Sequence, residues 1–244
     1  MKHFFVGAHR KCYIFATKCY SPTKYQGKKM ERKPKRRTRE RILELSQTLF
    51  NDFGEPNVTT SMIADEMNIS PGNLYYHFRN KDEIVNSIFG DFEREMDALL
   101  TTPAKRRINV EDAWLFLHLL FELIGKYRFI YRDLNDLLSR NRLIETHFKR
   151  ILEDSLKVAL ILARGMREAG ELSASEVELL ALANNMVLNA TYWLNFEYVR
   201  NPRKPIDGAA MGRGVYQMMS MVAPFLQGDA RALFERLARE YVSS

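Results

Sequence analysis

Apolar residues recur along most of the chain at intervals of three or four positions, the spacing of one face of an α-helix. The first such segment covers residues 38–53, and its regularly spaced apolar positions are Ile42, Leu45, Leu49 and Phe53. Gly54 ends this segment. The same spacing recurs at 60–67, 71–78 and 82–100, whereas the alternating pattern of strands is nearly absent. The pattern predicts an all-α fold.

Polar residues mark where these helices begin and turn. Thr38 and Thr60 are each predicted to cap a helix N-terminus, with the side-chain oxygen accepting a hydrogen bond from a free amide of the first turn. Asn68 suits a left-handed position in a tight turn, and Ser70 followed by Pro71 begins the next helix. Two helices joined by a turn of three or four residues predict a helix-turn-helix unit.

The boundary of a second, larger domain is predicted at Thr101-Thr102-Pro103. Beyond it, apolar spacing predicts helices over residues 110–125, 127–139, 142–169, 173–199, 207–227 and 229–242. The predicted organisation is an extension (1–29), a basic arm (30–37), a helix-turn-helix domain (38–81), a connecting helix (82–102) and a helical ligand-binding and dimerisation domain (103–244).

Membrane insertion is not indicated by the longest apolar run, AWLFLHLLFELI at 113–124. It has 12 residues and is interrupted by His118 and Glu122, so it is shorter than the roughly 18 residues that a membrane span requires. A buried helix of a cytoplasmic protein is the better interpretation. The two cysteines, Cys12 and Cys19, are too few for a disulfide scaffold.

The basic charge is confined to the start of the chain. The formal net charge is +7, and residues 1–29 hold seven Lys and Arg and no acidic residue, which accounts for all of it. Three interpretations of this segment stay open: an extension that precedes a true start at Met30, a disordered arm that touches DNA, or an organellar transit peptide. Residues 30–41 add a second basic cluster of seven bases and two acids.

The helix at 71–78 carries side chains suited to reading DNA bases. Asn73, Tyr75, Tyr76 and His77 point away from its apolar side, which is formed by Leu74 and Phe78. Asparagine can form two hydrogen bonds with adenine, and a tyrosine ring can pack on a thymine methyl group. Amides and hydroxyls at the start of the preceding helix, together with a lysine ammonium group, suit phosphate oxygens.

The run TTSMIADEMNISPGNLYYHFRNKDEIV (59–85) resembles the DNA-binding domain of the TetR family of bacterial transcriptional regulators, and the match extends over roughly residues 38–95. The sequence departs from the family pattern at Asn68, where glycine is usual, and at Asn73, where threonine is commoner. The resemblance implies DNA contacts at Thr60, Ser61, Pro71, Gly72, Asn73, Tyr75, Tyr76, His77 and Lys81. Arg36 and Arg37 of the basic arm are added as contacts to the DNA backbone or minor groove.

The resemblance also implies a body that senses a small ligand. Aromatic and polar residues within apolar helices give the candidates for an apolar ligand site: Trp114, His118, Phe121, Tyr131, Asn189 and Trp193. The alternative is that the aromatic residues are ordinary core, that His118 is a hydrogen-bonded core histidine, and that the asparagine pairs across an interface.

Dimerisation is predicted on the two helices at 173–199 and 207–227. Their regularly spaced apolar residues are Leu180, Val187, Leu194, Met211, Val215, Met218, Val222 and Phe225. The alternative is that both helices are buried within one subunit.

The predicted function is a ligand-responsive repressor that binds a palindromic DNA operator as a homodimer. One alternative is an architectural DNA-binding module without a small-molecule effector, which a solidly packed body would favour. An enzyme is not favoured, because the chain has no His-Glu-x-x-His, Cys-x-x-Cys or Gly-x-Ser-x-Gly motif. No catalytic residue, metal or cofactor is predicted.

Overall fold

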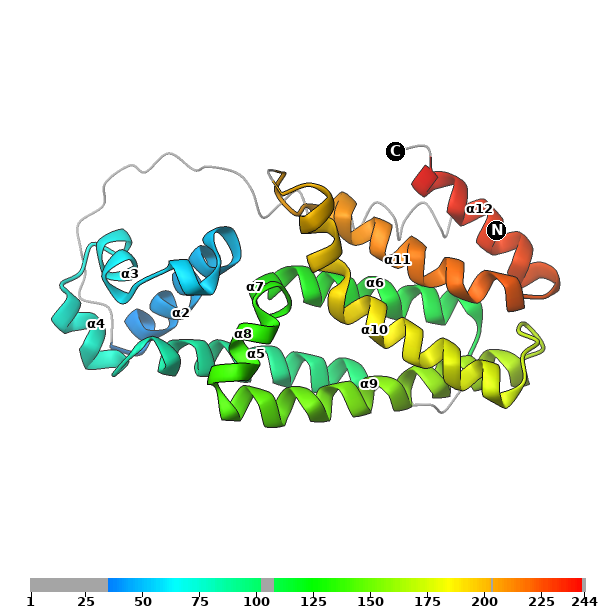
Figure 1. Ribbon diagram of the computed structural model, residues 1–244, viewed down its shortest axis with the longest axis horizontal. Helices are drawn as coiled ribbons and strands as arrows, with labels where there is room; N and C mark the ends of the chain where they lie inside the picture. The colour runs from blue at the N-terminus through cyan, green and yellow to red at the C-terminus, as the bar shows by residue number, and fades with distance from the viewer. Residues whose placement is uncertain (1–34, 102–107, 203, 243–244) are drawn as a thin grey trace. The chain divides into compact units, whose positions relative to one another are not determined.

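The computed structural model describes residues 35–101, 108–202 and 204–242, and this part of the chain is helical (Figure 1). Its elements are α2 (Lys35–Phe53), η1 (Glu55–Asn57), α3 (Thr60–Glu66), α4 (Pro71–His77), α5 (Lys81–Leu100), α6 (Val110–Lys126), α7 (Arg128–Arg132), α8 (Leu134–Arg140), α9 (Arg142–Glu168), α10 (Glu176–Arg200), α11 (Gly208–Val222), η2 (Ala223–Phe225) and α12 (Gly228–Val242). Within those residues, extended pairing is limited to one bridge between Leu172 and Leu226. The predicted all-α class is confirmed.

Helix α2 begins earlier and faces the core differently than the sequence predicted. It starts at Lys35, so Thr38 lies inside the helix and does not cap it. Its fully buried residues are Ile42, Ser46 and Phe50, whereas Phe53 is 58% exposed. Phe53, although one of the regularly spaced apolar positions, therefore lies off the buried stripe, which follows steps of four from Ile42. Gly54, at φ 90°, ends the helix as predicted.

The turn between α3 and α4 follows the predicted stereochemistry, except for one cap. Thr59, rather than Thr60, caps α3, because Thr59 has extended backbone and its side chain accepts from the Met62 amide at 3.2 Å. Asn68 is left-handed at φ 53°, as predicted. Ser70 caps α4 by accepting from the Asn73 amide at 3.2 Å. These local interactions fix the direction of α4.

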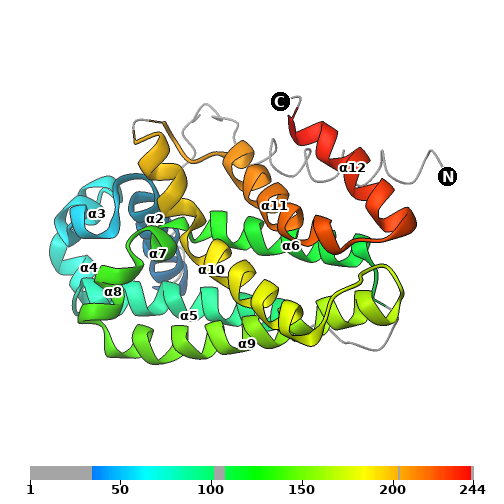
Figure 2. The same cartoon turned by 45° about the vertical axis from the view of Figure 1, so that its right-hand side comes forward.

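The body is a set of long helices packed on one another (Figures 1 and 2). Helix α5 contacts both α6 and α9, α10 contacts α9 and α11, and α11 contacts α6 and α12. None of the described helices is both long enough and apolar enough to cross a membrane. The mutual contacts of α5, α6, α9, α10 and α11 place most of the core among these helices.

Two segments predicted as single helices are each divided in the structure. Residues 127–139 form α7 and α8, which are separated at Asp133, whose carboxylate accepts from the Glu55 amide at 2.8 Å and pairs with Arg132. Residues 207–227 form α11 and then the 3-10 turn η2, because Pro224 cannot donate a helical hydrogen bond. Tertiary contacts and one proline therefore divide helices that apolar spacing alone had joined.

Some predictions fall on residues outside the described part of the chain. These are the three interpretations of residues 1–29, the first part of the basic arm at 30–34, and the Thr102-Pro103 boundary. Helix α5 ends at Leu100, close to the predicted boundary.

Candidate DNA-binding surface and ligand cavity

Helix α4 presents its polar side chains to solvent. Tyr75 and Tyr76 are 49% and 67% exposed, and Leu74 is completely buried beneath them. Four further residues with predicted DNA contacts are also exposed: Ser61, Pro71, Gly72 and Asn73. A short helix with a buried leucine and outward polar residues has the form of a recognition helix, which enters the major groove with its N-terminus first.

Two of the predicted contact residues are arranged by neighbouring side chains. The hydroxyl groups of Thr60 and Tyr75 lie 3.0 Å apart and share a hydrogen bond, which joins the start of α3 to the exposed face of α4. The half-buried His77 ring packs edge-on against Tyr76, with the ring centres 5.3 Å apart. The two tyrosines are therefore held in defined positions before any DNA arrives.

The predicted phosphate contact at Lys81 does not fit the structure. The Lys81 ammonium donates to the carbonyl oxygens of Glu55 and Val58, both at 3.0 Å, and lies 3.0 Å from Glu55 Oε1. The ammonium therefore makes two hydrogen bonds to carbonyl oxygens and one ion pair with the Glu55 carboxylate. The Glu55 side chain is fully buried and also pairs with Arg140 of α8. Lys81 is thus occupied within the protein, where it neutralises a buried carboxylate.

The basic arm is partly helical. Arg36 and Arg37 both lie in the first turn of α2, and the Arg37 residue is exposed to solvent. The side chain of Arg36 is outside the described part of the structure. The contacts predicted for these two arginines stay predictions.

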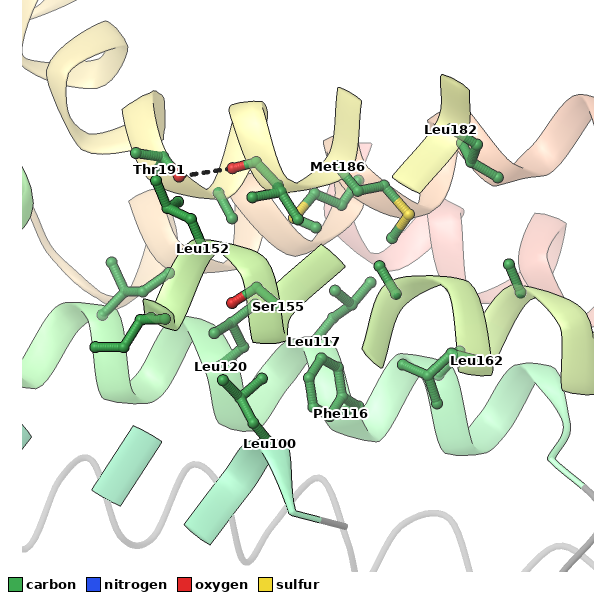
Figure 3. Close-up of a pocket in the computed structure, with 18 of the residues that line it drawn as sticks. Leu100, Phe116, Leu117, Leu120, Leu152, Ser155, Leu162, Leu182, Met186 and Thr191 are labelled. Carbon is green, nitrogen blue, oxygen red and sulfur yellow. Dashed lines mark hydrogen bonds between the residues drawn. The ribbon is translucent and has the colours of Figure 1, made fainter. Parts of the chain in front are cut away.

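An apolar cavity of about 60 Å³ lies in the body (Figure 3). Its wall is formed by residues of α5, α6, α7, α9, α10 and α11, with Leu100, Phe116, Leu120, Leu152 and Met186 among them. Figure 3 shows these side chains converging from helices that are far apart in the sequence. The body is therefore not solidly packed.

Of the six predicted ligand residues, Tyr131 lies on the cavity wall. Trp114 instead donates from its indole to His118 at 2.7 Å and packs against Phe234 of α12. The predicted roles of Trp114 and His118 as ligand contacts do not fit this arrangement, because both side chains face α12 or each other. The alternative of a hydrogen-bonded core histidine describes His118 better.

The other three candidates also lie outside the cavity wall. Phe121 packs so closely on α11 that a Cβ atom at Gly214 would overlap its ring. Trp193 donates to the Ala210 carbonyl at 2.8 Å and thereby joins α10 to α11. Asn189 has a buried Oδ1 atom that finds no hydrogen-bond partner in the described part of the chain. Phe121 and Trp193 therefore pack between helices, whereas no contact among the described residues assigns a role to Asn189.

Comparison with protein families accounts for both domains. Residues 42–88 match the model described as bacterial regulatory proteins of the tetR family. Residues 91–234, which are more than half of the chain, match the model described as bacterial transcriptional repressor TetR. The chain belongs to the TetR family of bacterial transcriptional regulators.

Individual relatives agree with this assignment. A TetR-family transcriptional regulator from Marinobacter aquaeolei VT8 has a solved structure with a TM-score of 0.76 and 33% identity, covering 84% of this chain and 98% of the other. The HTH-type transcriptional repressor KstR2 of Mycolicibacterium smegmatis is 39% identical over 54 residues, which is 22% of this chain and 26% of that repressor. The KstR2 structure from Mycobacterium tuberculosis, at 21% identity and a TM-score of 0.57 over 78% of this chain and 96% of that one, shares the fold.

The match to the curated KstR2 repressor spans about a quarter of its length. Its 54 aligned residues are fewer than a quarter of this TetR-family chain, so the match does not extend over most of the body. The cavity of this chain must therefore be interpreted from its own residues.

Five methionines that line the cavity of this TetR-family body were not predicted as site residues. They are Met96, Met166, Met186, Met218 and Met219. Methionine is unbranched and flexible, so such a wall can change shape around a ligand. The available signal was the concentration of methionine within helices of the body, but helical spacing cannot tell a cavity wall from a filled core.

Helix α7 connects the cavity to the DNA-binding domain formed by α2, α3 and α4. Arg132 donates to the carbonyl oxygens of Phe50 and Asn51, at 2.6 and 3.1 Å. Arg128 pairs with Asp52 at 2.5 Å. The Asn51 side chain in turn accepts from the Phe129 amide at 3.0 Å. The C-terminal end of α2 is therefore held by a short helix that also carries Tyr131.

Acidic residues of α5 form ion pairs with basic residues of the neighbouring helices α6 and α9. Glu93 contacts His147 at 2.7 Å and Arg150 at 2.8 Å, while Glu95 pairs with Lys126 at 2.7 Å. Burial alone raises the pKa of each carboxyl group, but the hydrogen bonds outweigh burial, so both pKa values lie below the ordinary 4.5. Both carboxylates are therefore charged at neutral pH.

The predicted dimer seam is largely inside the subunit. Val215, Met218 and Val222 are 1–2% exposed, and Leu194 is fully buried. Four of these seam residues pack as follows: Val187 and Met218 line the cavity, and Met211 and Phe225 pack partly buried against the core. The alternative of burial within one subunit therefore describes Leu194, Val215, Met218 and Val222, whereas Val187, Met211 and Phe225 are only partly buried. Leu180 is the exception among the predicted interface residues, because its side chain is 43% exposed.

A different face of α10 carries the exposed apolar residues. Its large exposed side chains are Val177, Leu180, Leu188, Tyr192, Phe196, Tyr198 and Val199. Leu188, Tyr192, Phe196 and Val199 follow steps of four, four and three, so they form one stripe along the helix. We call this set of four residues the α10 stripe. The helical spacing of these four residues is visible in the sequence. The sequence does not show which of the two apolar faces of α10 is exposed to solvent.

Proposed function

We propose that this TetR-family protein is a ligand-responsive transcriptional repressor that works in the cytoplasm and binds a palindromic operator as a homodimer. The observation that carries the proposal is helix α7, which has Tyr131 on an apolar cavity and Arg128 and Arg132 on the end of α2. A molecule in the cavity and the position of the DNA-binding domain are thus linked by one short helix.

DNA recognition is assigned to the exposed side of α4 and the start of α3. Asn73 and Tyr75 are proposed to contact base edges, with Tyr76 and His77 beside them. Thr60, Ser61 and the first amides of α3 are proposed to bind phosphate oxygens. Lys81 is left out of this set, because its ammonium group is already paired with Glu55.

Dimerisation is assigned to the α10 stripe. Leu188, Phe196 and Val199 are 59%, 54% and 75% exposed, and a contiguous row of exposed apolar residues on a long helix is typical of an interface. A partner copy that packs on this face would present two recognition helices to the two half-sites of an operator, whose centres lie one helical turn of DNA, or a multiple of it, apart.

The cavity favours ligand response over a purely architectural role. A body that only held two DNA-binding domains together would be expected to fill its core, because voids lose packing energy. The cavity is smaller than the roughly 300 Å³ of a typical ligand site, so a ligand has to displace side chains to enter. Such a displacement gives the ligand different affinities for two arrangements of the body, as a switch requires.

The test of DNA binding is selection of bound sequences from random DNA, followed by titration of the selected operator at fixed salt. Asn73→Ala and Tyr75→Ala are expected to weaken operator binding about tenfold or more, since a base contact contributes roughly 1–3 kcal/mol. Leu115→Ala, on the exposed side of α6, is the control and should bind normally. Unchanged affinity in both α4 variants would contradict the assignment.

Dimerisation is tested by sedimentation of Leu188→Glu and Phe196→Glu. A charge in the middle of an apolar interface should shift the protein toward the monomer and lower operator affinity. Leu119→Glu on α6, where the leucine is 44% exposed, is the matched control. A dimer unaffected by both α10 substitutions would place the interface elsewhere.

A further inference from the structure

The cavity wall contains very few polar groups. Among the residues described, no charged side chain lines it, and its side-chain hydroxyl groups belong to Tyr131, Ser155 and Thr191. The Thr191 hydroxyl donates to the carbonyl of Val187 at 2.7 Å, along its own helix (Figure 3). Polar recognition of a molecule in this cavity therefore falls to Tyr131 and Ser155.

Tyr131 is a buried tyrosine whose hydroxyl group is not used by the protein. The residue is 4% exposed, and its ring packs edge-on against Phe92 and Phe148, with centres 5.9 and 5.8 Å away. No hydrogen bond joins its hydroxyl group to another described residue, although this oxygen is not one of the fully enclosed atoms without a partner, which are Ser46 Oγ, Glu55 Oε1 and Asn189 Oδ1. The nearby buried Tyr127, by contrast, donates to Glu95 at 2.8 Å.

A hydroxyl group of a cavity-wall residue that makes no hydrogen bond to the protein is free to donate to a ligand that supplies an acceptor oxygen. We propose that the effector is an uncharged, mainly apolar molecule with one hydrogen-bond-accepting oxygen, such as the carbonyl of a ketone or ester, and that Tyr131 donates to that oxygen. The inference rests on the proposed ligand response. An ionised ligand is excluded because its charge would be buried against apolar side chains without a counter-charge.

The position of Tyr131 also explains how recognition reaches DNA. The Tyr131 carbonyl accepts from Asn195 of α10 at 3.2 Å, and Arg132, the next residue, donates to Phe50 of α2. A ligand that draws the Tyr131 hydroxyl toward itself therefore acts on the same five-residue helix that holds the DNA-binding domain. Apolar contacts elsewhere in the cavity supply affinity, whereas this hydrogen bond sets the position of α7.

The experiment uses 2-octanone as a neutral probe and octanoate, at pH 7, as a charged probe of equal carbon number. Binding to the full chain is measured by calorimetric titration. Tyr131→Phe removes the hydroxyl and keeps the ring, and the matched control Tyr127→Phe removes a hydroxyl that already has a partner in Glu95. We expect Tyr131→Phe to bind 2-octanone about fivefold more weakly than the natural protein, the effect of one hydrogen bond. Tyr127→Phe should bind it normally, and octanoate should bind at least about tenfold more weakly.

Unfolding without ligand supplies an independent measurement. Because the Tyr131 hydroxyl has no protein partner, Tyr131→Phe should unfold at the same or a higher temperature, whereas Tyr127→Phe should unfold at a lower one. In hydrogen exchange, 2-octanone should change the protection of residues 50–58 in the natural protein and do so less in Tyr131→Phe.

Three results would each overturn the inference: equal ketone affinity in the natural protein and Tyr131→Phe, octanoate binding as tight as the ketone, or a loss of stability in Tyr131→Phe. Absence of ketone binding to the natural protein would also overturn it. None of these results affects operator selection, which needs no ligand, so failure of the inference and failure of the proposed DNA-binding function are separately visible.

Discussion

The recognition helix and the ligand cavity are built in opposite ways. The outward residues of α4 come from one run of seven residues, Pro71–His77, whose direction is fixed by the Ser70 cap and the Asn68 turn. The cavity collects side chains from Met96 to Val222, across six helices, and its wall is almost entirely apolar. One site is local and exposed, and the other is non-local and buried.

This difference determines what each site can tolerate. Exposed side chains on a locally stabilised helix can change without loss of the fold, because they have few neighbours. Side chains of the cavity wall pack against residues of several helices on their other sides, so a change in their volume affects the packing of the body. Substitutions should therefore separate binding from stability in α4 and combine them in the body.

The largest expected effect on stability is in the body, at the crossing of α6 and α11. Gly214→Ala places a methyl group against the buried Phe121 ring and should lower the free energy of unfolding by about 2–3 kcal/mol. Gly90→Ala is the matched control, since a Cβ there meets nothing within 4 Å and the helix should gain about 0.5–1 kcal/mol. Denaturant unfolding of both variants measures the difference, and equal stability would show that α11 can move away from α6.

The next effect is at the junction of the two domains. Lys81→Met removes one counter-charge of the buried Glu55, and Arg140 remains as the other, so we expect a loss of about 1–2 kcal/mol in stability. Most of this loss should vanish when Glu55→Gln is added, because no buried charge is then left. A double-mutant cycle by denaturant unfolding tests this. If Lys81→Met weakens operator binding without loss of stability, Lys81 contacts phosphate after all.

A smaller effect on stability is expected when the pH is lowered. The pKa values of Glu93 and Glu95 are lowered, so their ion pairs stabilise the fold above the ordinary pKa of 4.5 and are lost as the pH falls through the lower folded-state values. Because Arg150 and Lys126 are about half exposed, we expect no more than about 1 kcal/mol per pair. Melting from pH 7 to pH 3 should show a shallower decline for Glu93→Gln than for the natural protein, and parallel curves would contradict the assignment.

The smallest effect on stability is expected on the recognition helix itself. Tyr76→Ala removes a ring that is 67% exposed and should change the free energy of unfolding by less than about 0.5 kcal/mol. Its affinity for the selected operator should nevertheless fall about tenfold. Unfolding and operator titration of the same preparation test both statements, and a large loss of stability would remove the contrast between α4 and the body.

Much of the DNA-binding domain was predictable because its determinants are close in sequence. Asn68 in the left-handed turn and Ser70 as a helix cap were both identified correctly. One prediction was wrong because two adjacent threonines could each cap α3. Thr59 is the cap, whereas Thr60 was predicted. The pairing of Lys81 within the protein was not predicted, because no local pattern shows that Glu55 lies buried beside it.

The body was predictable as helices but not as a site. Tyr131 was predicted as a ligand contact and lies on the cavity wall. Three other aromatic residues lie in similar apolar helical segments but pack away from the cavity: Trp114, Phe121 and Trp193. The face of α10 that points to solvent was also missed, since both of its faces are apolar. Helical spacing shows that a face is apolar, and it does not show what covers that face.

The sequence by itself determined the all-α fold, the helix-turn-helix and its family, because capping, turn geometry and helical period act between residues a few positions apart. Tertiary structure alone decided that Tyr131 meets the cavity, that Lys81 neutralises Glu55 and that the α10 stripe remains exposed. Those outcomes depend on which helices pack together, and packing is set by the shapes of side chains far apart in the chain.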